Sequence, residues 1–229
     1  MRIIREKTAA VCVDYQERIL PAMTDPETLL QNTVKLLKGL RVLGVPVYLT
    51  QQYTKGLGDT VAPIREAAGT SEHLEKLTFS AYPQLREKLL PPEQQPYVLL
   101  CGIESHICVL QTAMDLKAHG YQPYLVADCL SSRKPADHRM ALERAKQEGI
   151  LLTTCEATLF ELLAAAGTPD SKAIQEDHQV KKRGTPSGVP RFCYPTGIST
   201  MPMPRRRAYS VVRRVPPGSP SCTAISSEA

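Results

Sequence analysis

The stretch Tyr97-Val-Leu-Leu-Cys101-Gly-Ile-Glu-Ser-His-Ile-Cys108-Val-Leu-Gln-Thr112 decides how the chain is interpreted. Its apolar start, residues 97–101, is typical of a buried strand, and residues 107–118 have a helical pattern that Gly120 ends. A strand that changes abruptly into a helix is the repeating unit of α/β folds. The stretch therefore predicts a strand, a tight turn and a helix with Cys108 in its first turn.

The same alternation recurs on both sides of this stretch. Further strands are expected at residues 8–13, 45–50, 124–127 and 150–153. Further helices are expected from a cap at Asp25, with Pro26 at the first position, to Gly44, and at 135–148 and 157–166. Nearly all-apolar strands that alternate with helices predict an α/β fold, a three-layer α/β/α sandwich with a mostly parallel, Rossmann-like sheet. In such sheets functional groups gather beyond the carboxyl ends of the strands.

The net charge of +5 is unevenly distributed along the 229 residues. Residues 181–229 hold nine Lys or Arg, one acid and eight of the 19 prolines, so their net charge is +8 and that of residues 1–180 is −3. We expect one folded domain at 1–180 and a basic, Pro/Ser/Arg-rich, disordered tail at 181–229. Residues 51–76 are expected to loop over the carboxyl edge of the sheet.

Composition also excludes several classes of protein. No run approaches the roughly 18 apolar residues that span a bilayer, and the apolar stretch near the start is too short for a signal peptide. The seven cysteines are odd in number and form no CxxC pair, which disfavours a disulfide framework and a structural zinc site. We therefore expect a cytoplasmic protein.

Two residues at predicted strand ends are candidates for chemistry. Asp14 closes the first strand, where it either titrates in a site or caps a loop. Cys108 lies where helix N–H groups lower the pKa of a thiol and stabilise an oxyanion, although free cysteines are more often small buried residues. The core is the expected place for four further cysteines, Cys12, Cys101, Cys129 and Cys155.

A cysteine nucleophile needs a base, which is usually histidine. His106 is too near Cys108 in the chain for the required contact, and we expect it to be a pocket or loop residue. An aspartate serves instead if a lysine keeps it charged and oriented, and Lys76 is the lysine set among apolar residues. The other histidines have surface-like contexts: His73, His119, His138 and His178.

Three motifs together resemble the isochorismatase-like cysteine hydrolases. They are Val11-Cys-Val-Asp14-Tyr-Gln16, Lys76 followed by Phe79-Ser-Ala-Tyr82, and Gly102-Ile-Glu-Ser-His-Ile-Cys108-Val109. The likeness covers about residues 5–165. The segment 51–58 is further similar to the branch of isochorismatase domain-containing proteins of unassigned substrate.

The resemblance implies a six-stranded, mostly parallel sheet and a triad. Asp14 is then the general base, Cys108 the nucleophile, and Lys76 the cation that orients both. The family forms a thioester on cysteine, which water hydrolyses. The resemblance also implies an oxyanion hole from the backbone N–H groups of Glu104 and Cys108, and a cis peptide bond between Ile103 and Glu104.

Two departures from the family pattern narrow the range of possible substrates. Residues 51–70 contain no histidine, which disfavours the metal site of nicotinamidases, and we expect neither a metal nor a cofactor. The presence of Cys108 argues against cleavage of a vinyl ether, so a small amide, carbamoyl or ester substrate remains. The substrate pocket is expected to include Gln16, Gln51, Tyr53, Ser105 and His106.

Alternatives of other classes stay open at this point. The domain is either an enzyme or a binding and scaffolding module without turnover. The arginines at 205–207 and 213–214 suggest that the tail binds a polyanion such as RNA. Aromatic residues, on which bases would stack, are sparse in the tail, which disfavours this role. We expect a small-molecule substrate, no membrane partner, no nucleic acid, and a homo-oligomer. Apolar helix faces such as that of Leu36, Leu40 and Leu43 are candidates for the subunit contact.

Overall fold

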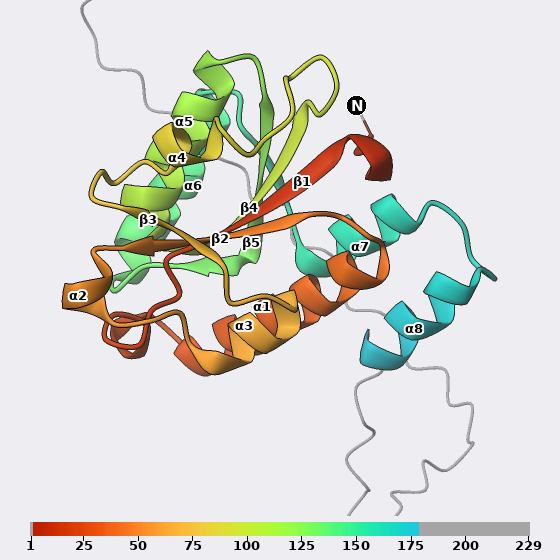
Figure 1. The fold of residues 1–229 in the computed structure, drawn as a ribbon, viewed down its shortest axis with the longest axis horizontal. Helices are drawn as coiled ribbons and strands as arrows, with labels where there is room; N and C mark the ends of the chain where they lie inside the picture. The colour runs from red at the N-terminus through yellow and green to blue at the C-terminus, as the bar shows by residue number, and fades with distance from the viewer. Residues whose placement is uncertain (1, 179–229) are drawn as a thin grey trace, which may run out of the picture. The chain divides into compact units, whose positions relative to one another are not determined.

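A six-stranded sheet forms the centre of the protein (Figure 1). The computed structural model describes residues 2–178, so the predicted tail at 181–229 lies outside the described residues. The strand order is β3-β2-β1-β4-β5-β6, and every neighbouring pair is parallel. The strands are β1 (Thr8–Val13), β2 (Val47–Gln52), β3 (His73–Lys76), β4 (Tyr97–Ile103), β5 (Gln122–Ser131) and β6 (Leu151–Thr153).

Helices cover both faces of the sheet. The α-helices are α1 (Pro26–Val42), α2 (Thr54–Leu57), α3 (Ala62–Ala68), α4 (Tyr82–Leu85), α5 (Leu110–Ala118), α6 (Pro135–Gln147), α7 (Cys155–Leu163) and α8 (Pro169–His178). Shorter turns are η1 (Arg5–Lys7), η2 (Leu20–Ala22) and the π-helical η3 (Ser105–Val109). One core lies under α1, α3, α7 and α8, and a second under α4, α5 and α6 (Figure 1).

The sequence of β1 shows how one strand serves two cores. Ala10 and Cys12 pack in the core under α1, whereas Ala9, Val11 and Val13 pack in the core under α5. Successive side chains of a strand point to opposite faces, so a strand covered on both sides must be apolar throughout. The predicted α/β/α sandwich with a parallel sheet is confirmed.

Two elements of the fold differ from the expectation. The predicted loop at 51–76 contains α2, α3 and the edge strand β3, whose four residues include only one buried side chain, Lys76. The helix α8 begins at Pro169, in a region where the sequence predicts no apolar period beyond about Asp170, and Ile174 packs it on the core. Both elements bury too few apolar side chains to produce a periodic signal.

The start of α1 follows the expected pattern. Asp25 accepts a hydrogen bond from the Thr28 N–H at 3.3 Å, and Pro26 is the first helical residue. The predicted oligomer face is wrong, because Leu36, Leu40 and Leu43 are at most 1% exposed and face the core. These leucines hold the helix on the sheet and offer no surface to a second subunit.

The strand order reverses between β1 and β4, which are neighbours in the sheet although β2 and β3 lie between them in the chain. Open parallel sheets bind ligands at this kind of position, beyond the carboxyl ends of the strands. Gly102 lies opposite Val13 at that end, with a φ of 145°. A Cβ at Gly102 would overlap the Val13 carbonyl oxygen, so only glycine lets the two strands approach here.

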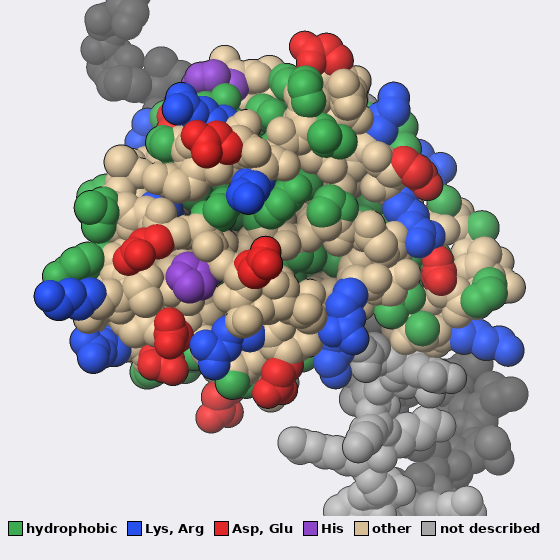
Figure 2. All heavy atoms as spheres, viewed as in Figure 1, with side chains coloured by type: hydrophobic (Ala, Val, Ile, Leu, Met, Phe, Trp, Pro, Cys, Tyr) green, Lys and Arg blue, Asp and Glu red, His purple; other side chains and the backbone are tan. Residues whose placement is uncertain are grey.

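The surface carries both signs of charge. Figure 2 shows acidic and basic side chains interspersed over the face in view, around a central group of apolar side chains. Across residues 2–178, no helix is both long and apolar enough to cross a membrane.

Candidate active site

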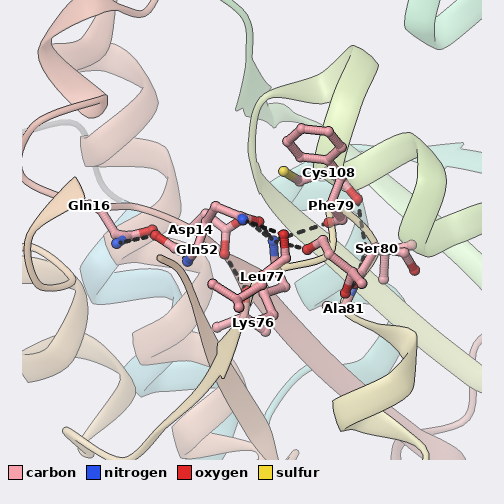
Figure 3. A network of polar contacts seen from close by, with 12 residues as sticks. Asp14, Gln16, Gln52, Lys76, Leu77, Phe79, Ser80, Ala81 and Cys108 are labelled. Atoms are coloured by element: carbon pink, nitrogen blue, oxygen red, sulfur yellow. Dashed lines mark hydrogen bonds and ion pairs between the residues drawn. The ribbon is translucent and has the colours of Figure 1, made fainter. Parts of the chain in front are cut away.

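A buried ion pair joins the ends of two strands. Nζ of Lys76, the last residue of β3, lies 2.6 Å from Oδ2 of Asp14, the residue after β1 (Figure 3). The Lys76 and Asp14 side chains are 0% and 3% exposed. Taking two charges out of water costs several kcal/mol per ion, which only close pairing and further hydrogen bonds offset.

Neighbouring polar groups complete the environment of the pair. Thr50 of β2 donates a hydrogen bond to Oδ1 of Asp14 at 2.7 Å. Lys76 Nζ donates to Oε1 of Gln52 at 2.7 Å and to the carbonyl of Phe79 at 3.0 Å. The Thr78 carbonyl lies 3.4 Å from the same nitrogen, so acceptors surround the ammonium group. Within residues 2–178, Oδ2 of Asp14 has no hydrogen-bond partner and is paired only with this ammonium.

The Cys108 thiol lines the same cavity as Asp14, and it lies close enough to Asp14 and Lys76 for the charges of both to act on it (Figure 3). Burial raises the pKa of Cys108 to about 12, the negative charge of Asp14 adds to the increase, and the positive charge of Lys76 opposes it. The prediction that the start of a helix lowers the pKa of Cys108 is wrong. The loss of solvent and the charge of the Asp14 carboxylate both raise this pKa and outweigh the effect of the helix. Cys108 is therefore a protonated thiol at neutral pH, beside a carboxylate.

The turn that carries Cys108 is π-helical, and the regular helix α5 begins only at Leu110. The Thr112 hydroxyl donates to the Cys108 carbonyl at 2.6 Å and accepts from the Ala81 N–H at 2.9 Å. π-Helical turns recur at functional sites. Here one hydroxyl links the turn of Cys108 to the loop that follows Lys76.

The peptide bond between Ile103 and Glu104 is cis, as the resemblance implied. The Glu104 carbonyl accepts from the N–H groups of Ile107 and Val109 at 3.1 and 3.3 Å. The Glu104 carboxylate accepts from the Arg133 N–H at 3.0 Å and from its Nε at 3.1 Å. Burial acts to raise the pKa of Glu104, but these hydrogen bonds and the charge of Arg133 lower it overall.

A cavity of about 280 Å³ opens beside the thiol. Its polar or charged lining residues are Asp14, Gln52, Glu104, Cys108 and Arg133. Its apolar lining residues are Ile19, Leu57, Phe79, Ile103 and Ile107. Within residues 2–178, no three His, Cys, Asp or Glu side chains lie close enough together to hold a metal ion.

The sequence profile of the Isochorismatase domain matches residues 8–157, which hold β1 to β6 and all the site residues described above. The chain belongs to the isochorismatase family. Isochorismatase domain-containing protein 1 of Danio rerio is 39% identical over 165 residues, which are 72% of this chain and 58% of that protein. Isochorismatase domain-containing protein 2A of Mus musculus is 37% identical over 175 residues, 76% of this chain and 84% of that protein.

A solved structure of this isochorismatase-family fold comes from Caenorhabditis elegans, described as MAR1 ribonuclease. It is 31% identical, with a TM-score of 0.73 over 83% of this chain and 98% of that one. The chain thus has the isochorismatase-like hydrolase fold, and the resemblance on the three motifs is confirmed. The Danio rerio relative extends well beyond the part that this chain spans.

The five pocket residues expected from the family resemblance lie around the cavity and do not line it. Gln16 is fully buried and holds two loops together, donating from Nε2 to the carbonyls of Gln52 and Gly58 at 3.0 and 2.7 Å. Gln51 donates to the Thr60 hydroxyl at 3.0 Å. Tyr53 is 49% exposed and borders a separate hollow with Leu77. Strand alternation explains the difference, since Gln51 and Gln52 face opposite sides of β2.

Ser105 and His106 connect η3 to neighbouring elements. The Ser105 hydroxyl lies 2.9 Å from Nδ1 of His138 in α6, so His138 is part of a hydrogen bond and not a free surface residue. Burial lowers the pKa of His138. Nδ1 of His106 lies 2.9 Å from the Ser132 hydroxyl, and its Nε2 lies 3.9 Å from Asp137. These contacts hold the turn that carries Cys108.

Four site residues were missed by sequence reasoning: Thr50, Gln52, Phe79 and Arg133. Thr50 and Gln52 lie two positions apart at the carboxyl end of β2, and period-two alternation places both on the face of the ion pair. Phe79 belongs to the motif after Lys76, where it was not assigned a role. Arg133 follows β5, and no local pattern indicated that it would reach Glu104.

Proposed function

We propose that the chain is a cysteine hydrolase that cleaves a small amide, carbamoyl or ester through a thioester on Cys108. One observation supports the proposal: a protonated thiol lies within the electrostatic reach of a buried carboxylate in one cavity, and a buried ammonium pairs with that carboxylate. A nucleophile within reach of its base, which a third group orients, is the general arrangement of covalent catalysis. Asp14 is the proposed base, Cys108 the nucleophile and Lys76 the orienting cation.

In the first step, the Cys108 thiol proton moves to Oδ2 of Asp14. The sulfur electron pair forms a bond to the substrate carbonyl carbon, and the carbonyl π electrons move to oxygen. The backbone N–H groups of Glu104 and Cys108 are the proposed donors to that oxyanion. The positive charge of Lys76 stays beside the site while the negative charge moves from the Asp14 carboxylate to the substrate oxygen. That negative charge therefore has a cation nearby at both stages.

The tetrahedral intermediate then collapses. The carbonyl re-forms, the bond to the leaving group breaks, and the leaving nitrogen or oxygen takes the proton from Asp14. Water next loses a proton to Asp14 and attacks the thioester carbon, the bond from carbon to sulfur breaks, and the sulfur takes the proton back. Amide and water are thereby converted to acid and amine, with the enzyme restored.

Two other functions fit the same fold. A binding module without turnover would need the pocket but not a buried ion pair next to the Cys108 thiol, which favours the enzyme. An RNA substrate, suggested by the name of the C. elegans relative, would meet the carboxylates of Asp14 and Glu104. The two cations beside them, Lys76 and Arg133, are each paired with one of those carboxylates. The cavity therefore favours a small carbonyl substrate.

The polyanion-binding arm, the homo-oligomer and the cytoplasmic location stay proposals. Five buried free cysteines fit a reducing compartment: Cys12, Cys101, Cys108, Cys129 and Cys155. The polyanion-binding arm is tested by measuring binding to a polyanion at low and moderate salt, with and without residues 181–229. Equal binding by the truncated chain would rule the arm out. Sedimentation of the full chain tests the oligomer.

Capture of the acyl intermediate tests the proposed function. The full chain is mixed with a panel of small amides, ureas and esters, quenched in acid and mapped by mass spectrometry. We expect an acyl group on Cys108, and no turnover by Cys108→Ala. The matched control Cys155→Ala removes a buried cysteine outside the cavity and should keep the adduct. Turnover of the panel by Cys108→Ala would contradict the mechanism.

A further inference from the structure

Five of the ten residues that line the cavity are large and apolar, and they come from five different places in the fold. Ile19 lies just before η2, Leu57 ends α2, Phe79 follows β3, Ile103 ends β4 and Ile107 belongs to η3. Figure 3 shows the Phe79 ring beside the Cys108 sulfur. A substrate whose carbonyl carbon reaches this sulfur must therefore place its remaining atoms against hydrocarbon.

The charges around the cavity are balanced in pairs. Asp14 pairs with Lys76 at 2.6 Å, and Glu104 pairs with Arg133 at 3.1 Å. The Glu104 carboxylate is 4% exposed and also accepts the Arg133 backbone N–H, whereas the Arg133 side chain is 60% exposed and contacts Glu104 through Nε. An anionic substrate would enter a space with two carboxylates and no unpaired cation among its lining residues. Burying an unpaired charge is strongly unfavourable.

We propose that the cavity selects amides or esters of uncharged, apolar acids, with a short aliphatic or aromatic acyl group. This inference rests on the proposed hydrolase function and names its substrate class. A volume of about 280 Å³ corresponds to roughly nine water-sized volumes of about 30 Å³ each. An acyl group of about six to nine heavy atoms, such as hexanoyl or benzoyl, fits this space.

The first test compares two substrates of equal carbon-chain length on the unmodified full chain. Hexanamide and adipic acid monoamide differ at the far end, where a methyl group is replaced by a carboxylate. We expect kcat/KM for hexanamide to be at least 100-fold higher, since the carboxylate would be buried without a partner. An equal or higher kcat/KM for the monoamide would overturn the inference.

A separate measurement distinguishes this failure from failure of the proposed function. The p-nitrophenyl esters of hexanoic acid and of adipic acid are mixed with the full chain, and the adduct on Cys108 is mapped with Cys108→Ala as background. Preferential acylation by hexanoyl supports the apolar class. Acylation by both acyl groups at one rate overturns the apolar class and leaves the cysteine hydrolase standing. Absence of any Cys108 adduct overturns both.

A charge variant tests the same inference from the side of the protein. Leu57→Lys places a cation in the apolar wall, and Met140→Lys is the matched control on an exposed position of α6, outside the cavity. We expect Leu57→Lys to lower kcat/KM for hexanamide and raise it for the monoamide, a combined change of at least tenfold in their ratio. The control should leave the ratio unchanged. An unchanged ratio in folded Leu57→Lys would contradict the proposal.

Discussion

Nζ of Lys76 lies 2.6 Å from Oδ2 of Asp14, and the charges of both side chains act on the nearby Cys108 thiol. The three residues follow or end β1, β3 and β4, whose carboxyl ends meet at one edge of the sheet. The parallel arrangement of the strands thus converts three distant chain positions into one cluster. Its charges balance when the thiol is protonated, which explains how a Lys and an Asp are tolerated in a dry site.

Loss of the cation should leave a buried carboxylate without a partner. We expect Lys76→Met to lower the free energy of unfolding by about 3 to 5 kcal/mol, measured by urea denaturation. The double variant Asp14→Asn/Lys76→Met removes both charges and should recover a large part of that loss. If the double variant loses as much as the two single variants together, the ion pair is not the source of the effect.

Close approach of β1 and β4 should make Gly102 intolerant of substitution. Gly102→Ala places a Cβ against the Val13 carbonyl and should lower the free energy of unfolding by about 2 kcal/mol or more. Gly167→Ala is the matched control, because Gly167 also has a positive φ, 82°, but no atom lies within 4 Å of its added Cβ. Equal destabilisation by thermal melting would mean that backbone conformation, and not the strand contact, decides the loss.

The Glu104 to Arg133 pair should contribute to stability in a defined pH window. The pKa of Glu104 is lowered in the folded protein, so its contribution is present above the unfolded value of about 4.5 and is lost as pH falls through the folded value. Between pH 6.5 and 3.5, the native chain should therefore lose more stability than Glu104→Gln. Glu143→Gln, in an exposed ion pair of α6, should behave as the native chain. Equal losses of stability in all three proteins would show that the Glu104 to Arg133 pair does not contribute to stability in this pH window.

Most of the fold and the central cluster could be predicted from the sequence. Apolar runs such as the one before Asp14 indicate buried parallel strands, because both faces of each strand must be covered. β3 was missed because an edge strand of four residues buries only Lys76. The pKa of Cys108 was predicted in the wrong direction, because a helix start is visible in the sequence whereas burial beside Asp14 is not. The cavity wall, with Leu57 and Arg133, depends on contacts between loops that carry no local pattern.

The reaction of Cys108 with iodoacetamide across pH, in the native chain and in Asp14→Asn, tests the central claim most directly. In the native chain the thiol has a pKa of about 12, raised by burial and by the charge of Asp14. Removing that charge should lower the apparent pKa and speed alkylation of Cys108 near pH 8, while substrate turnover falls by roughly 10²- to 10⁴-fold because the base is lost. Opposite changes in the two rates are the predicted result. A fall in both rates, or an unchanged alkylation profile, would contradict the account.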